Sequence, residues 1–335
     1  MNLVTGATGL MGSHMLAELI RQGEKVKAYY HTESKKAFVY NTLSLYSPQP
    51  EKIMEEIIWV QGDVLDKYSL AAAMEGVNKV YHAAGMVSLT GKSKEKMLRV
   101  NIRGTANVVD ACLENNVSRL CHVSSIAALG DATEGNLIDE TCQLISDKKL
   151  SAYSYSKFKG EMEVWRGIHE GLPAVIVNPS VILGPGMWNS ATAAFVNRVY
   201  KGLSFYPPGS VGFVDVRDVA SVMFKLMNSN ISGERYIVNS ENMTFRDFFT
   251  LIARELGKKS PVYKITPWMG TTAVIADLLQ SLVTGRQRQI TRNALRIAAE
   301  KTAYSNAKIK ELLSVEFMPV SESVRLIAEE YLKRL

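Results

Sequence analysis

The chain has 335 residues, 47% hydrophobic and 21% charged, which is enough to bury one large core or two closely joined ones. The net charge of +6 comes from lysines and arginines scattered along the sequence, which argues against a nucleic-acid-binding protein. Three cysteines with no Cys-x-x-Cys pair favour neither a disulfide framework nor a zinc site. We expect reduced thiols, no metal and, because the first predicted strand leaves no room for a signal peptide, a cytoplasmic location.

A glycine-rich turn lies near the start of the chain. An apolar strand, residues 3–5, runs into Gly6, Gly9 and Gly12, and a predicted helix at 11–22 follows. Glycines let the backbone approach a pyrophosphate, and the unpaired N–H groups of a helix start attract that anion. The spacing is Gly-x-x-Gly-x-x-Gly rather than Gly-x-Gly-x-x-Gly, but the order of strand, turn and helix predicts a dinucleotide-binding site.

Strand-like and helix-like segments alternate through the first half of the chain. The predicted strands are residues 3–5, 25–30, 57–61, 79–83, 119–124 and 174–178, and the predicted helices are 11–22, 69–74, 94–115 and 153–169. This alternation predicts an α/β fold, a Rossmann doubly wound parallel sheet. Ligands on such sheets bind beyond the carboxyl ends of the strands.

After Pro179 the alternation breaks down into a glycine- and proline-bearing stretch. We expect a dinucleotide-binding Rossmann domain at 1–178 plus 213–239, and a smaller, mostly helical C-terminal substrate lobe at 179–212 plus 240–335. The apolar segment 268–283 is shorter than the ~20 residues of a membrane-spanning helix. We expect it to be buried or to line a pocket, and we do not expect membrane association.

Tyr153 and Lys157 are four residues apart in a predicted helix, so both lie on one face. A fixed positive charge favours a phenolate, so we expect Lys157 to lower the pKa of Tyr153 from its ordinary value near 10. Tyr153 would then serve as a general acid or base. Tyr155 and Lys159 have the same spacing, so spacing alone does not choose between the two pairs.

Five ordered motifs resemble those of the extended short-chain dehydrogenase/reductase family, also known as the NAD-dependent epimerase/dehydratase family. They are the glycine turn at 5–12, His82-Ala83-Ala84-Gly85, Ser124-Ser125, Tyr153-x-x-x-Lys157 and the segment 178–186. The resemblance spans nearly the whole chain. Within the family the chain looks most like the dihydroflavonol-reductase-like and 3β-hydroxysteroid-dehydrogenase-like branch, whose members interconvert a carbonyl and an alcohol with a nicotinamide cofactor.

The resemblance implies that Ser125, Tyr153 and Lys157 are the catalytic residues. It selects this tyrosine and lysine because the family's pattern ends in Ser-Lys followed closely by an acidic residue, here Ser156-Lys157 and Glu161. Ser125 matches the family's serine, although a slip of one residue to Ser124 stays open. The serine would donate a hydrogen bond to the substrate oxygen as charge develops there.

The resemblance also implies the cofactor contacts, with Asp63 at the adenine and 83–85 under the nicotinamide ribose. The full set is Gly6, Thr8, Gly9, Leu10, Met11, Gly12, His31, Lys35, Asp63, Val64, Ala83, Ala84, Gly85, Tyr153, Lys157, Pro179 and Val181.

The end of the second predicted strand bears on the choice of nicotinamide cofactor. NAD-preferring folds commonly place an acid there, and this chain has Tyr30. His31, with Lys35 or Lys36, could accept the 2′-phosphate of NADP. We therefore expect NADP, while Glu33 leaves NAD open.

Together these residues predict an NAD(P)H-dependent oxidoreductase that interconverts a ketone or aldehyde and an alcohol, with Tyr153 as proton donor or acceptor. The alternatives are a nucleotide-sugar epimerase or dehydratase and a non-catalytic NAD(P)-binding sensor. Ile126-Ala127 replaces the Asp-Glu that dehydratases of the family carry beside the catalytic serine or threonine, and an intact triad argues against the sensor. The resemblance further implies a possible homodimer through helices 94–115 and 153–169.

The expected pocket walls are largely apolar and favour an apolar or mixed small-molecule carbonyl or alcohol substrate. They comprise Met86, Val87, Leu89, Met187, Trp188 and the C-terminal lobe.

Overall fold

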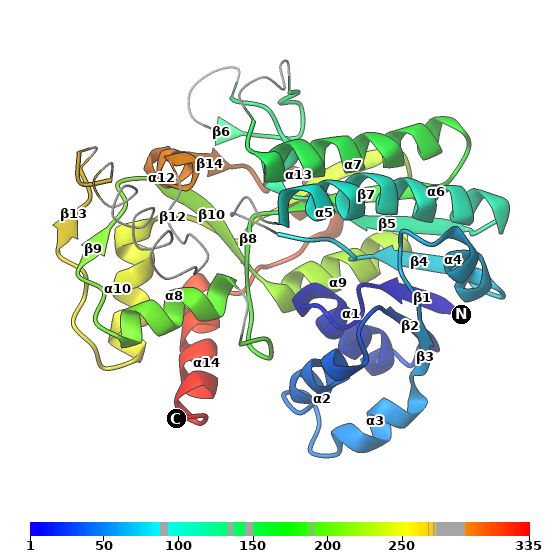
Figure 1. Ribbon diagram of the computed structural model, residues 1–335, viewed down its shortest axis with the longest axis horizontal. Helices are drawn as coiled ribbons and strands as arrows, with labels where there is room; N and C mark the ends of the chain where they lie inside the picture. Colours follow the sequence, from blue (N-terminus) through cyan, green and yellow to red (C-terminus); the bar gives the residue numbers. More distant parts are fainter. Residues whose placement is uncertain are drawn as a thin grey trace.

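A seven-stranded parallel sheet forms the centre of the computed structural model, with strand order β11-β7-β5-β4-β1-β2-β3 (Figure 1). The structure describes residues 1–87, 93–132, 137–144, 150–188, 191–266, 268–270, 272 and 292–335. The strands are β1 (Asn2–Thr5), β2 (Val26–Tyr30), β3 (Ile58–Gln61), β4 (Lys79–His82), β5 (Arg119–Val123), β7 (Ala174–Pro179) and β11 (Glu234–Val238). The predicted doubly wound α/β fold is confirmed.

Helices cover both faces of this sheet, so its central strands bury most of their residues. They are α1 (Leu10–Arg21), α2 (Lys36–Leu43), α3 (Pro50–Glu56), α4 (Lys67–Met74), α5 (Lys94–Leu98), α6 (Thr105–Glu114), α7 (Ala152–His169) and α9 (Val216–Met227). α1 and α9 pack on one face, and α4, α6 and α7 pack on the other. The predicted helix 94–115 is present, but a π-helical segment, Arg99–Gly104, separates α5 from α6.

The short helices α2 and α3 were not predicted. They lie between β2 and β3 and are only eight and seven residues long, too short for their hydrophobic residues to show a clear helical period, and Pro50 opens the second of them at a position that proline favours.

The rest of the chain builds a second lobe around a three-stranded sheet of β8 (Val181–Leu183), β10 (Ser210–Asp215) and β12 (Glu241–Thr244). Its helices are α8 (Ala191–Tyr200), α10 (Phe245–Glu255), α12 (Arg292–Ala299) and α14 (Val320–Leu332), whereas α13 (Ala307–Leu313) packs against β11 of the large sheet. Two further strand pairs join β9 (Phe205–Tyr206) to β13 (Tyr263–Lys264) and β6 (Leu137–Ile138) to β14 (Ala303–Tyr304). An aromatic core holds this lobe, with the rings of Phe213 and Phe248 stacked at 4.2 Å.

The segment 213–239, which we expected to return to the Rossmann domain, contributes to strands in two different sheets. β11 adds to the edge of the large sheet beside β7, whereas β10 pairs with β8 and β12. The predicted domain division itself stays a prediction. Of the apolar segment 268–283, only 268–270 and 272 lie within the described residues, among which no helix is long and apolar enough to cross a membrane.

The packing of α1 against α9 generates a stability prediction. Leu226 is fully buried on α9 in the same cluster as Leu16 and Leu19 of α1. Leu226→Ala should lower the free energy of unfolding by about 2–5 kcal/mol, because it removes buried methyl groups and leaves a cavity. Leu332→Ala, the same change at a residue 43% exposed, should stay within about 0.5 kcal/mol. Equal effects in urea unfolding would contradict this packing.

Candidate active site

A single cavity of about 2760 Å³ extends from the glycine turn to the second lobe. Most of the predicted site residues line it: Gly6, Thr8, Gly9, Leu10, Met11, His31, Lys35, Asp63, Val64, Ala83, Ala84, Gly85, Ser125, Tyr153, Pro179 and Val181. Gly12 and Lys157 lie behind this wall. The site is therefore at the carboxyl ends of the parallel strands, where doubly wound sheets bind their ligands.

The glycine turn fits the pyrophosphate of a dinucleotide. Gly6 has a φ of +65°, and a Cβ there would lie 2.6 Å from the Cα of Ala84. Gly9 is the N-cap of α1 without a side-chain cap, and no acidic residue stands in the first turn. The first N–H groups of this helix therefore stay available to an anion.

Gly12 does not line the cavity and has a packing role. A Cβ at this position would lie 2.2 Å from the carbonyl oxygen of Gly6. Its missing side chain lets α1 pack tightly against the turn, so it shapes the binding loop without presenting a surface to the ligand.

Just after β2, the carboxylate of Glu33 is bound by neighbouring side chains and is not part of the cavity lining. The Tyr30 hydroxyl donates to Glu33 at 2.5 Å, and the Lys36 ammonium lies 2.9 Å from the same carboxylate. His31 and Lys35 line the cavity, and the His31 ring lies 3.5 Å from Asp63.

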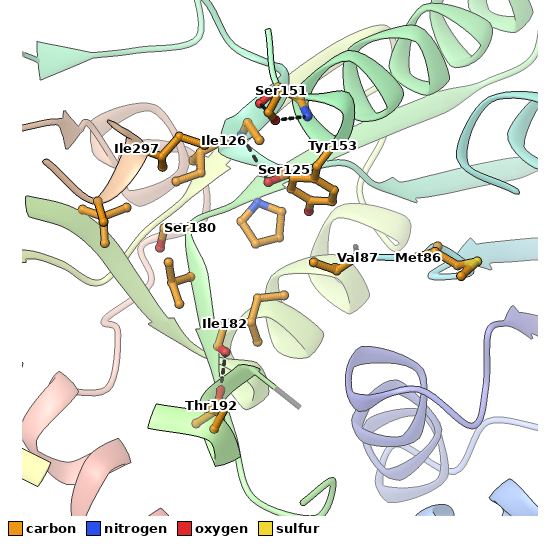
Figure 2. A pocket seen from close by; sticks show the side chains of 18 of the residues that line it. Met86, Val87, Ser125, Ile126, Ser151, Tyr153, Ser180, Ile182, Thr192 and Ile297 are labelled. Carbon is orange, nitrogen blue, oxygen red and sulfur yellow. Dashed lines mark hydrogen bonds between the residues drawn. The ribbon is translucent and has the colours of Figure 1, made fainter. Parts of the chain in front are cut away.

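Ser125 and Tyr153 lie side by side on the cavity wall in Figure 2, close enough for the serine hydroxyl to affect the phenol. Ser125 follows β5, and its hydroxyl also accepts the N–H of Ala127 at 3.1 Å. Ser151 caps the start of α7 by accepting the N–H of Ser154, which places Tyr153 in the first turn.

The two serines both line the cavity but have different partners. The Ser124 hydroxyl donates to the buried carboxylate of Glu161 at 2.6 Å, whereas Ser125 meets Tyr153. Tyr153 lines the cavity, whereas Tyr155 is not among the lining residues and has the Lys159 ammonium over its ring.

Lys157 is buried one helical turn after Tyr153, and its ammonium donates to the carbonyl oxygen of Val123 at 2.8 Å. Burial lowers its pKa to about 8, and the nearby negative charge of Glu161 opposes part of that fall.

The expectation that Lys157 lowers the pKa of Tyr153 is wrong for the cofactor-free protein. Burial raises the pKa of Tyr153 above its ordinary value, and the neighbouring Ser125 hydroxyl offsets part of the rise. The reason is that the Lys157 ammonium is directed at the Val123 carbonyl rather than at the phenol.

His82 is a buried structural residue. Its Nδ1 lies 2.7 Å from the Thr5 hydroxyl and its Nε2 lies 3.1 Å from the Thr105 hydroxyl. Because Thr105 donates to the carbonyl oxygen of Asn101, it accepts from Nε2, so Thr5 donates to Nδ1. Burial lowers the pKa of His82 to about 3, and the neutral ring joins β1 to the π-helical segment.

Asn101 is a positioning residue that the sequence reasoning missed. Its side chain accepts the N–H of Met86 at 2.7 Å, and its amide donates to the carbonyl of Met86 and to the Ser156 hydroxyl, each at 2.9 Å. It thus ties the segment after β4 to α7. The motif around Asn101 is a family signature, but its role needs the fold, because Met86 and Ser156 are distant in sequence.

The predicted pocket walls are partly correct. Met86, Val87 and Met187 line the cavity, whereas Trp188 packs against Tyr331 of α14 with 5.6 Å between ring centroids. Leu89 lies outside the described residues.

Residues 2–239 match the family model described as the NAD dependent epimerase/dehydratase family. The chain belongs to this family. It is an NAD(P)-dependent oxidoreductase of the extended short-chain dehydrogenase/reductase type, as the names of its relatives support.

Two relatives and one solved structure illustrate the similarity. A protein of Synechocystis sp. named "Putative dihydroflavonol 4-reductase" is 26% identical over 96% of this chain and 91% of its own length. Tetraketide alpha-pyrone reductase 2 of Arabidopsis thaliana is 30% identical over 71% of this chain and 77% of its own. The crystal structure of gox2253 has a TM-score of 0.82 at 28% identity and covers 99% of this chain and 98% of that one.

The buried amine of Lys157 generates a pH-dependent stability prediction. Its ordinary pKa of 10.5 falls to about 8 on folding. Between pH 8 and pH 10.5 the unfolded chain binds this proton more tightly than the folded protein, so the free energy of unfolding rises with pH in that range. Below pH 8 the amine is charged in both states, and the buried charge lowers the free energy of unfolding by its full amount. The free energy of unfolding of Lys157→Met should therefore be about 1–3 kcal/mol higher than that of the native protein at pH 7, and this difference should shrink between pH 8 and 10.5.

Urea unfolding at several pH values measures this difference. Lys159→Met is the matched control on the same helix, because Lys159 lies against aromatic rings near the surface, and it should show no such pH trend. A Lys157→Met protein less stable than the native one at pH 7 would contradict the account.

Proposed function

We propose that this enzyme is an NADP(H)-preferring reductase that interconverts a ketone or aldehyde and the corresponding alcohol. The observation that carries this proposal is the adjacent pair of Ser125 and Tyr153 on the wall of the cavity that the glycine turn also lines. A proton donor and a second hydroxyl beside a dinucleotide cradle are what carbonyl reduction requires.

Each residue has a distinct task in that reaction. The nicotinamide cofactor, when bound, supplies the hydride to the carbonyl carbon. Tyr153 gives its phenolic proton to the carbonyl oxygen, and Ser125 donates a hydrogen bond to the same oxygen as negative charge develops there. Lys157 would hold the ribose of the bound cofactor, because its amine lies next to the cavity wall, 3.8 Å from where a Cβ at Gly85 would be.

The choice of NADP rests on the end of β2. Glu33, the acid that could bind a ribose 2′-hydroxyl, is engaged by Tyr30 and Lys36. His31 and Lys35 line the cavity nearby and offer the positive charge that a 2′-phosphate prefers.

An apolar or mixed substrate is supported by the cavity wall around the proton donor. Ile126 and Ala127 stand directly after Ser125, where dehydratases of the family carry Asp-Glu, and Ile182 lies across from Ile126 in Figure 2. Val181 also lines the cavity. Such a surface matches a hydrophobic body better than the hydroxyls of a sugar, because hydroxyls buried without partners are costly.

The first test of this proposal replaces the proton donor. Tyr153→Phe should lower kcat for reduction by about 10²–10⁴-fold, because it removes the acid but keeps the ring. Tyr155→Phe, the same change two residues along, should stay within about twofold. Loss of absorbance at 340 nm measures turnover with a panel of ketones, aldehydes and nucleotide sugars.

Unchanged reduction by Tyr153→Phe would overturn the assignment. Isomerisation of a nucleotide sugar without net oxidation of the cofactor would instead identify an epimerase, and tight cofactor binding without either reaction would identify a sensor.

The second test addresses the cofactor. Lys35→Ala should lower kcat/KM for NADPH by about tenfold, since one charge-assisted contact to the phosphate is lost, and leave NADH within about twofold. Lys52→Ala, an exposed lysine on α3, should alter neither value. A native enzyme that prefers NADH, or equal losses with both cofactors, would contradict the predicted preference.

A further inference from the structure

One buried carboxylate lies directly beneath the predicted catalytic residues. Glu161 is on α7, one turn after Lys157 and two turns after Tyr153, so the three side chains share a face of the helix. It is only 1% exposed. A buried carboxylate requires several donors to offset the loss of water, so the question is which groups supply them.

Four donors from four different elements meet this carboxylate. Oε2 accepts from the Ser124 hydroxyl at 2.6 Å and from the Asn178 amide at 2.8 Å. Oε1 accepts from Arg235 at 3.2 Å and from the Trp165 indole at 3.3 Å. Glu161 therefore joins the ends of β5 and β7 to β11 through a single side chain.

The network reaches the catalytic serine through the backbone. The Asn178 amide that contacts Glu161 also donates to the carbonyl oxygen of Ser125 at 3.0 Å. The Ser124 hydroxyl is bound to Glu161 and the Ser125 carbonyl is bound to Asn178. The backbone is therefore held on both sides of the Ser125 side chain.

The network also reaches the loop that forms part of the cavity wall. Arg235, whose side chain is 13% exposed, donates to the carbonyl oxygens of Glu140 and Cys142. The Cys142 carbonyl in turn accepts the N–H of Gly130, and Gly130 and Gln143 line the cavity. Hence the same ion pair fixes the catalytic serine and one wall of the cavity.

We propose that Glu161 is a positioning residue: its carboxylate fixes the strand end that carries Ser125 and supplies the negative charge one helical turn from Lys157. The inference rests on the proposed function, since it assigns a role within that reaction. Among the described groups, His82 faces Lys157 from β4, His122 from β5 and Glu161 from its own helix. Burial lowers the pKa of both histidines, so they are neutral and leave Glu161 as the compensating charge.

Glu161→Gln is the direct test, because glutamine has the same shape without the charge. The titration of the Lys157 amine is followed by NMR of ¹³C-lysine-labelled, cofactor-free protein, with the signal assigned by its absence in Lys157→Met. Since Glu161 raises the pKa of Lys157, the midpoint should fall by about one pH unit from about 8. The kcat for carbonyl reduction at pH 7 should fall at least about tenfold, with KM for NADPH within about twofold.

Glu163→Gln is the matched control, because this glutamate is on the same helix and pairs with Arg166 near the surface. It should leave the Lys157 midpoint and kcat unchanged. A folded Glu161→Gln protein with an unchanged Lys157 midpoint would overturn the proposal.

Ser124→Ala keeps the proposal testable if Glu161→Gln does not fold. It removes one donor and leaves the charge, so kcat should fall about threefold or more while the Lys157 midpoint stays in place. Native kcat in Ser124→Ala would count against the positioning role. If the native enzyme reduces no carbonyl, the proposed function fails, whereas the lysine titration still reports on Glu161.

Discussion

The organisation of this site depends on a lysine ammonium buried against a backbone carbonyl. Within the described residues, Lys157 donates to Val123 and has no ion-pair partner closer than 4 Å. A buried charge without direct neutralisation costs free energy, and burial lowers the pKa of this amine to about 8. The protein retains that cost at the point where the glycine turn, β5 and α7 meet, which is where a nicotinamide ribose would offer hydroxyl acceptors.

The fold brings the other groups to the same point. Parallel strands deliver their carboxyl ends to one edge, so Ser125 after β5 and Pro179 at the end of β7 reach one cavity. Helix α7 crosses beneath and contributes Tyr153, Lys157 and Glu161 at intervals of four residues. The Tyr153 phenol lines the cavity and the Glu161 carboxylate is buried two turns further along the same face, so reactivity and negative charge are separated along a single helix.

Sequence reasoning identified the fold because its signals were local. The glycine turn, each predicted strand and the Tyr153–Lys157 spacing are all signals contained in a short segment of sequence. The structure confirms the predicted strands to within one or two residues at each end. Helices α2 and α3 were not predicted because their hydrophobic residues show only a weak helical period.

What the sequence could not supply were contacts between distant residues. The roles of Asn101 and Glu161 depend on partners tens of residues away, such as Met86, Asn178 and Arg235. The pKa of Tyr153 was misjudged for the same reason, because spacing places an amine on the correct face without fixing what it contacts. The different partners of the two serines, both of which line the cavity, likewise depend on the fold, since the Glu161 carboxylate engages Ser124.

A crystal structure of the protein with NADP⁺ bound tests the central claim most directly. The account predicts the pyrophosphate at the start of α1, the Lys157 amine within hydrogen-bond distance of the nicotinamide ribose, and the nicotinamide ring facing the hydroxyls of Ser125 and Tyr153. A nicotinamide ring that lies away from Tyr153, with Lys157 still bonded only to Val123, would contradict it.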